Sequence, residues 1–560
     1  MAAGNLALVL HAHLPYVHSN EPGSLEEDWY FQALLECYLP LLDVLEQAAA
    51  DPAQKPHLSM GLSPTLLSLL SNAELSRRFQ PWLAVRLELL QLAPVSHQPA
   101  AAVLEQQLNR AIASWQACGG DLLPRFRQLQ QTGVLDLLTC AATHGYLPLL
   151  RDCPEAVRAQ LLTAVREHER LLGVRPQGIW LPECAYYEGL DRLLVSCGLR
   201  YAILDAHGLL HGQPRPRYGV YAPICTPVGM AFFGRDSEST LPVWSARDGY
   251  PGQAPYREFH RDLGWDLPAE ELAKRGIGCP RPLGLKLHRV SGRNCSLEAK
   301  QPYRPAEAQA TVRADAHHYL QGRAQQLEAL VDAMDRPPLL VAPFDAELFG
   351  HWWFEGPQFL AELFRQAPAA GVELITLRAS LSRGESLQLC QPSPSSWGQG
   401  GYHNYWLNES NAWVIPQWHR ASRAMVERVN RGVATAADRE LLDQAGRELL
   451  LAQSSDWSFI LRAGTTTELA RERIERHLDR FWRLLAALEQ GQPPPSEWLA
   501  AVCREDGLFP CVNAADWATP PSRLVAAPPL AAQAVPPYGP TPKRADAGGR
   551  TPEPNDGTDP

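Results

Sequence analysis

Short apolar runs alternate with helical patterns over roughly the first 380 residues, and this alternation constrains the fold more than any other feature. Helical spacing of apolar residues separates the runs, for example over 30–47 and 155–172. Strands that alternate with helices predict βαβ units with a parallel sheet, and so many strands favour a barrel or near-barrel over an open sheet. The runs expected to form strands are 6–10, 57–62, 134–140, 178–181, 201–204, 228–233, 283–287, 339–344 and 372–377.

Changes of composition divide the chain into three parts. The first is an α/β catalytic domain over 1–380, with a helical insertion at about 73–131 and, at about 233–264, a long loop of the kind that forms lids. After residue 416 the apolar residues follow only the i, i+3, i+4 spacing, which predicts an all-α C-terminal domain over 381–517. Residues 518–560 are dense in Pro and Ala and predict a disordered tail.

Charge and composition exclude several classes of protein. The 560-residue chain has a net charge of −10 and no basic cluster, which argues against a nucleic-acid partner. No apolar run reaches the ~20 residues of a membrane span, and the N-terminus lacks the basic region of a signal peptide. The twelve cysteines form no C-x-x-C pair and suit free thiols in a reducing compartment. We expect a cytoplasmic protein, as a monomer or homodimer.

The sixteen tryptophans suggest a carbohydrate ligand. Indole rings can fill a core, but open rings also provide platforms on which sugars stack through their C–H bonds. Several tryptophans stand among polar, charged or glycine residues, which favours platforms without excluding the core. These are Trp29, Trp265, Trp352, Trp353, Trp397, Trp406 and Trp413.

The pattern His11-Ala12-His13 ends the first apolar run. Alternation along a strand puts both imidazoles on the same side, which at the carboxyl end of a barrel strand can face the active site. The pair could bind a metal, hold a substrate through polar contacts, or serve only the structure.

Two carboxylates follow two other apolar runs. Glu183 comes after 178–181 and Pro182, and Asp345 comes after Leu339–Ala342, with Glu347, His351 and tryptophans close behind. A structural ion pair or a helix cap is the alternative at each position. Two acids from different strand ends, beside aromatic residues, suit glycoside chemistry, in which one attacks the anomeric carbon and the other protonates the leaving oxygen.

These motifs together resemble glycoside hydrolase family 57, and within it the 1,4-α-glucan branching enzymes. The resemblance covers 11–15, 139–146, 178–187, 343–357 and 395–413, in this order. It implies an incomplete (β/α)7 barrel, a helical C-terminal domain that contributes to the cleft, and a retaining mechanism without metal or cofactor. It also implies Glu183 as nucleophile and Asp345 as general acid/base, acting on α-1,4-glucan as donor and acceptor.

The resemblance further implies a set of substrate-binding residues. His11, His13 and His144 resemble residues lining the first sugar subsite, and Asp456 resembles a helical-domain acid that reaches the cleft. Arg261 could stay charged and hold Glu183 ionised. The tryptophans carried over are Trp265 as a cleft residue, Trp397 and Trp406 as acceptor-side platforms, and Trp29 as a possible further platform.

Branching and hydrolysis share the glycosyl-enzyme intermediate and differ in what accepts the sugar. Branching requires that water be excluded and an acceptor chain held. A mobile loop with an aromatic tip is expected for branching, and 233–241 is the candidate, although no aromatic residue follows Phe233 through Leu241. An α-amylase or 4-α-glucanotransferase of the same family is the main alternative. More remote alternatives are a metal-dependent hydrolase, with His288 and Asp345 as additional ligands, and a non-catalytic glucan-binding protein.

Overall fold

The structure is a computed structural model that describes residues 4–18, 23–245 and 248–520. The disordered tail predicted over 518–560 lies outside the described residues from residue 521 onward. None of the helices in the described part of the chain is both long enough and apolar enough to cross a membrane.

A parallel sheet around the first strand supplies the framework of the site. Its order is β3-β2-β1-β8, and β9 also pairs with β1. Strand β1 is buried along its whole length, as expected for a central parallel strand covered on both faces. Its five members are β1 (Asn5–Ala12), β2 (Leu58–Leu62), β3 (Leu135–Leu138), β8 (Leu339–Asp345) and β9 (Glu373–Leu374).

A second sheet has the order β10-β6-β7-β5-β4. The contacts that link it to the first sheet include a parallel bridge between Thr139 and Ile179, and a hydrogen bond of 2.8 Å from the Asp236 N–H to the Val341 carbonyl. The second sheet consists of β4 (Gly178–Ile179), β5 (Tyr201–Leu204), β6 (Ile224–Cys225), β7 (Ala231–Gly234) and β10 (Gln388–Leu389).

The strand predicted over 283–287 is wrong. Leu283, Leu285 and Leu287 are buried, but no strand forms there, because the Asp262 carboxylate accepts the backbone N–H groups of Gly284 and Leu285 at 2.9 and 3.1 Å. A side chain thus replaces the neighbouring strand as hydrogen-bond partner, which the apolar pattern does not reveal.

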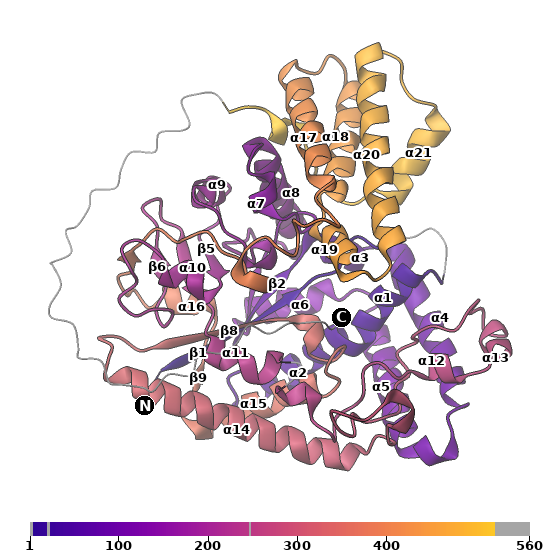
Figure 1. Cartoon of the computed structure of the whole chain (residues 1–560), viewed down its shortest axis with the longest axis vertical. Coiled ribbons are helices and arrows are strands. Elements are labelled where there is room, and N and C mark those ends of the chain that lie inside the picture. Colours follow the sequence, from indigo (N-terminus) through magenta and orange to yellow (C-terminus); the bar gives the residue numbers. More distant parts are fainter. Residues whose placement is uncertain (1–3, 19–22, 246–247, 521–560) are drawn as a thin grey trace.

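Helices cover the sheets and form the inserted segment. The predicted insertion contains α4 (Ala73–Leu90), α5 (Gln98–Ala117) and α6 (Leu123–Gln131). In the first half, α1 (Leu25–Ala33) is followed by a π-helix (Leu34–Tyr38) and α2 (Leu39–Ala50). Of the covering helices, α8 (Pro154–Leu172), α14 (Pro305–Val331) and α15 (Gly356–Ala370) are the longest around the sheets, and α14 runs along one side of the molecule in Figure 1.

The segment predicted as the long loop 233–264 is more ordered than expected. It contains α11 (Ser237–Trp244), a short turn at Tyr250–Gly252 and the start of α12 (Leu263–Asp266). The Asp236 side chain caps α11 by accepting the N–H groups of Glu238 and Ser239, so a helix begins directly after β7. The expectation of an irregular loop over 237–244 is therefore wrong.

The C-terminal helices form one body at the end of the molecule where Figure 1 is coloured orange to yellow. Of these helices, α19 lies at the end nearest the strands (Figure 1). The C-terminal helices begin at Val414, later than the predicted start of the domain at residue 381. Within 381–413, β10 pairs with β6 and so belongs to the second sheet. The members are α17 (Val414–Asn430), α18 (Ala436–Ala452), α19 (Ser455–Ala463), α20 (Thr467–Gln490) and α21 (Ser496–Glu505).

Candidate active site

Glu183 stands on a tight turn at the end of β4. Residues Pro182–Cys184 form one 3₁₀ turn, and Glu183 and Cys184 both adopt left-handed backbone conformations, with φ of 59° and 50°. Such conformations cost about 1–3 kcal/mol each in non-glycine residues and occur preferentially at functional sites. The side chain of Glu183 is 18% exposed, so the turn presents the carboxylate at an opening and not in the core.

Trp397 contacts the nucleophile candidate through both backbone and side chain. Ser395 pairs with Tyr186 in an antiparallel bridge, and the Trp397 N–H donates to the Glu183 carbonyl at 3.0 Å. The bridge brings the indole to the carboxylate, where Nε1 donates to Oε2 at 2.7 Å. Trp397, predicted as a stacking platform, thus also holds Glu183 in place.

Asp345 ends β8, where it pairs in register with His11 of β1. Its carboxylate lies close enough to Glu183 that the charge of Asp345 raises the pKa of Glu183. Two residues on, the Glu347 Oε1 accepts from the Tyr38 hydroxyl at 2.5 Å and from the His13 N–H at 3.1 Å. The π-helix that carries Tyr38 therefore helps to fix the segment that follows the acid.

The site raises the pKa of both acids. The pKa of Glu183 lies at about 8, mainly because of burial; the charges of Asp345 and Asp456 add to the rise, and the Trp397 hydrogen bond opposes it. The pKa of Asp345 also lies at about 8, again mainly because of burial; the charge of Glu347 adds to the rise, and His13 and Arg235 oppose it. A hydrogen bond to the carboxylate favours ionisation, whereas a neighbouring negative charge favours the protonated acid. Both acids therefore keep a proton to higher pH than an exposed carboxylate does.

Three histidines form a stacked group beside Glu183. His11 and His13 stack at 5.7 Å between ring centroids, as their alternation predicted, and His13 and His144 stack at 4.0 Å. His11 is 3% exposed and lies between Trp180 and His144, so it supports the other two rings. Burial lowers the pKa of both His11 and His144 well below the usual range. The 3.9 Å approach of His144 to Glu183 is therefore a neutral contact.

Asp456 joins the helical domain to this group. It lies in the first turn of α19, and its two carboxylate oxygens lie 3.0 and 3.2 Å from His13 Nε2. Burial alone would raise its pKa, but the charge of and hydrogen bond from His13 lower it to about 2. A bridge between Gly145 and Ser454 brings the two segments together.

The same side chains supply potential metal ligands. Donor atoms of His13, His144 and Asp456 lie within 4.8 Å of one another, and so do those of His11, Cys140 and His144. However, the rings of His13 and His144 are 15° from parallel, so their in-plane lone pairs do not converge on one point. Tetrahedral coordination needs converging donors, and His13 and His144 do not provide them.

The contacts of Arg261 in the described structure are with groups other than the two carboxylates. Arg261 donates to the carbonyl oxygens of Leu297 and Glu298 at 2.8 and 3.0 Å, and its Nε lies 3.6 Å from Asp266. Its expected role in holding Glu183 ionised therefore stays a prediction. Trp265 is 55% exposed on α12, and Trp29 is half-buried against the core, so their contact with substrate remains a prediction.

Trp406 is a core residue, which contradicts its prediction as a platform. It is 2% exposed and stacks on Tyr146 at 4.5 Å between centroids. A Cβ at Gly398 would lie 2.5 Å from the indole, so the loop backbone covers the ring closely. The neighbouring Tyr405 instead contacts the exposed Phe459. The sequence does not reveal which of the adjacent rings, Tyr405 or Trp406, is buried, because burial depends on the segments that pack against them.

Four side chains at the site were absent from the predicted set: Trp180, Trp244, Arg235 and Tyr38. Trp180 and Trp244 contact Trp397 at 5.0 and 5.6 Å between ring centroids. Arg235 lies 5.8 Å from the Trp397 ring and acts on the pKa of Asp345. Trp244 lies three residues beyond Leu241, the end of the candidate loop 233–241. A candidate loop that continued through α11 would have included Trp244.

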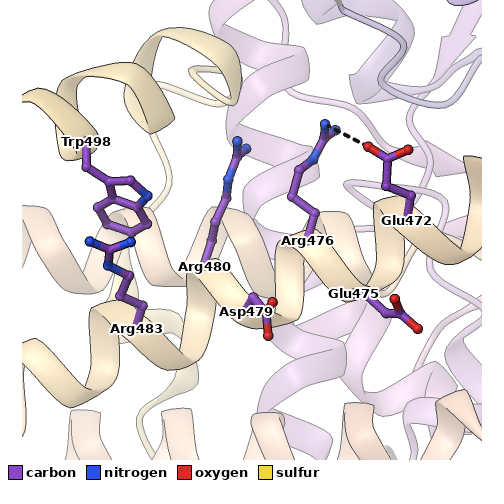
Figure 2. Close-up of a pocket in the computed structure, with 7 residues that line it drawn as sticks. All are labelled: Glu472, Glu475, Arg476, Asp479, Arg480, Arg483 and Trp498. Atoms are coloured by element: carbon purple, nitrogen blue, oxygen red, sulfur yellow. Dashed lines mark ion pairs between the residues drawn. The ribbon is translucent and has the colours of Figure 1, made fainter.

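A separate pocket of about 520 Å³ lies on α20 and α21. Figure 2 shows Arg483 beneath Trp498, 4.0 Å from its ring centroid, and Arg476 turned toward Glu472. Arg476 pairs with Glu472 and Arg480 pairs with Glu505, and no predicted site residue lines the pocket. Glu183 and Asp345 lie at the strand ends and not in this pocket.

Comparison with known proteins places the chain in a family. Residues 7–267 match the profile of glycosyl hydrolase family 57, and residues 417–517 match that of the 1,4-alpha-glucan branching enzyme C-terminal region. A 1,4-alpha-glucan branching enzyme of Thermococcus kodakarensis is 32% identical over 515 residues, which cover 86% of this chain and 73% of the relative.

Two solved structures share the whole architecture. The α-amylase AmyC of Thermotoga maritima superposes with a TM-score of 0.85 at 34% identity, covering 92% of this chain and 99% of AmyC. The family 57 branching enzyme of Pyrococcus horikoshii superposes with a TM-score of 0.83 at 30% identity, covering 94% and 100%. The chain therefore belongs to glycoside hydrolase family 57 and to its branching-enzyme group.

Proposed function

We propose that this protein cleaves α-1,4-glucan at Glu183 and Asp345 and transfers the released chain to the 6-hydroxyl of another glucan, forming an α-1,6 branch. The observation that carries the proposal is the meeting of two acids at one site. Glu183 and Asp345 come from the ends of different strands, and the charge of Asp345 acts on the pKa of Glu183. Retaining glycoside chemistry needs two neighbouring carboxyl groups, one as nucleophile and the other as general acid/base.

In the first step a Glu183 carboxylate oxygen attacks the anomeric carbon, and the glycosidic oxygen leaves with the proton of Asp345. This gives a glycosyl ester on Glu183. In the second step the Asp345 carboxylate takes the proton of the acceptor 6-hydroxyl. The oxygen of that hydroxyl attacks the anomeric carbon and displaces Glu183. For this chemistry the carboxyl groups should be about 5–5.5 Å apart, which leaves no space for water between them.

The arrangement of the strands supports the finer proposal of an incomplete (β/α)7 barrel. Seven strands follow one another in the order β8, β1, β2, β3, β4, β5 and β7. The Thr139–Ile179 bridge joins β3 to β4, and the Asp236 hydrogen bond returns from the end of β7 to β8. The helical domain is proposed to end at residue 517 and to begin at Val414 instead of residue 381, because β10 pairs with β6 of the second sheet.

The histidine group with Asp456 is proposed to hold the sugar that Glu183 attacks. Imidazoles and a carboxylate offer both donors and acceptors to sugar hydroxyls.

The cysteines bear on the location of the protein. Twelve unpaired cysteines suit a reducing, cytoplasmic location. We expect a monomer or homodimer, which light scattering coupled to size-exclusion chromatography measures directly.

The similarity to AmyC keeps hydrolysis as the second candidate function. Incubation with amylose, followed by debranching and chain-length analysis, separates the two. New α-1,6 linkages with little reducing sugar support branching, whereas abundant reducing ends without such linkages overturn it. Activity lost to a chelator and restored by zinc would instead indicate a metal-dependent hydrolase.

Azide rescue tests the residue roles with α-maltosyl fluoride, a donor that needs no acid catalysis. Azide should react with Glu183→Ala to give the β-glycosyl azide by direct inversion. With Asp345→Ala it should give the α-glycosyl azide, because the covalent intermediate still forms. If Glu183→Ala gave the α-azide and Asp345→Ala the β-azide, the two residues would have each other's roles. If azide rescued neither variant, both assigned roles would be refuted.

A further inference from the structure

An exposed tryptophan stands beside the candidate nucleophile and has no role in the chemistry above. Trp244 is the last residue of α11 and is 38% exposed, whereas Val243 before it is buried. Its ring centroid lies 5.6 Å from that of Trp397, with 37° between the planes. Trp397 contacts Trp244 on one side and donates a hydrogen bond to Glu183, so only the Trp397 ring separates Trp244 from the proposed nucleophile.

The position of Trp244 is fixed by the strand that carries the acid. The backbone N–H of Asp236, the N-cap of α11, donates to Val341 of β8, the strand that ends at Asp345. Arg235 Nε donates to Thr240 within α11 at 3.1 Å and so links the start of the helix to its middle. A large ring that the fold holds in place but leaves exposed is typical of an aromatic binding surface.

The two oxygens of Glu183 face different partners. Oε1 faces His144 at 3.9 Å, and Oε2 faces the tryptophans through Trp397. Arg235 lies against Trp397, and both His13 and Arg235 act on the pKa of Asp345, so the general acid is close to both sides of Glu183. Because the histidine group is proposed to hold the sugar that Glu183 attacks, the tryptophan side remains for the acceptor. The acid protonates the leaving oxygen, and the acceptor later occupies the place of the leaving chain.

We infer that Trp244 stacks on a glucose ring of the acceptor glucan, and that with Trp397 it forms a two-ring wall on the acceptor side of Glu183. This inference rests on the proposed branching function. It adds an acceptor-binding residue that acts after the glycosyl ester has formed. A bound acceptor over this wall also displaces water from the intermediate, so the wall favours transfer over hydrolysis.

The test compares Trp244→Ala, Trp244→Leu and Trp244→Phe on amylose. The readout is the number of α-1,6 linkages formed per reducing end released. Alanine and leucine should lower this ratio about tenfold because neither has a π face, while phenylalanine should keep it within about threefold. Leucine preserves apolar volume, so it separates loss of stacking from loss of packing if the alanine variant fails to fold. Trp498→Ala, on α21 (Figure 2), is the matched control and should leave the ratio unchanged.

An equal fall in branching and hydrolysis would indicate a structural role for Trp244 and overturn the inference. Failure of the branching proposal itself is distinguishable, because then the wild type forms no α-1,6 linkages. Calorimetric titration of maltoheptaose into Glu183→Gln provides the second readout. Adding Trp244→Ala to that background should raise the dissociation constant about tenfold, or about 1.4 kcal/mol at 25 °C. A constant within twofold of the parent contradicts the inference.

Discussion

His13 and Asp456 meet across 443 positions of the sequence, with the imidazole Nε2 3.0 Å from one carboxylate oxygen. One residue follows β1 and the other lies in the first turn of α19, so the contact joins the strand domain to the helical domain. It also sets the electrostatics of the site, because the charge of His13 lowers the pKa of both Asp456 and Glu183. The active site is therefore complete only when the two domains are docked.

Replacing Trp397 by Phe should move the acidic limb of the pH profile of kcat/KM upward by about one pH unit. The indole hydrogen bond lowers the pKa of Glu183, and the nucleophile must be ionised to attack. Without that bond the pKa rises, so a higher pH is needed for the same ionised fraction. Trp498→Phe serves as the control. An unchanged acidic limb in Trp397→Phe would mean that Glu183 does not set it.

Glu347→Gln should move the alkaline limb in the opposite sense, to lower pH, by about one unit. The acid must be protonated, and the charge of Glu347 raises the pKa of Asp345. Removing that charge lets Asp345 lose its proton at lower pH. Tyr38→Phe deletes the 2.5 Å hydrogen bond that lowers the pKa of Glu347, so Glu347 carries less charge and a smaller shift in the same direction is expected. A shift of the acidic limb alone would assign Glu347 to the nucleophile instead.

Glu183→Gln should stabilise the protein at pH 8, on the order of 2 °C in Tm, and leave it almost unchanged at pH 5. The pKa of Glu183 is raised from an ordinary value of 4.5 to about 8. Between these values the folded protein keeps a proton that the unfolded chain releases, so wild-type stability falls as pH rises. Glutamine removes this dependence. Thermal unfolding across pH measures it, with the exposed Glu188→Gln as control; parallel curves for Glu183→Gln and wild type would contradict the expectation.

Trp406→Ala should reduce stability and spare glucan binding. The ring is buried against Tyr146, so its removal leaves a cavity that costs about 3–5 kcal/mol of unfolding free energy. Denaturant unfolding measures this loss. Under conditions where the variant is folded, its dissociation constant for maltoheptaose should stay within about threefold of wild type. A large loss of affinity with normal stability would restore Trp406 as a platform.

The sequence by itself determined where the two candidate acids stand. Apolar runs that end in Glu183 and Asp345 place both carboxylates at carboxyl ends of parallel strands, and local strand geometry fixes that outcome. The alternation in His11-Ala12-His13 likewise predicted two imidazoles on one side. These features depend on periodicity over a few residues, which a sequence records directly.

Only the tertiary structure decided which side chains surround those acids. Trp397 contacts Glu183 and Trp244 remains exposed, while Trp406 is covered by a loop and Arg261 binds backbone carbonyls elsewhere. Whether an aromatic ring faces solvent, and which carboxylate an arginine reaches, depends on elements that pack from distant parts of the chain. Such contacts leave no local periodicity, and for that reason the strand ends were predictable and the walls of the site were not.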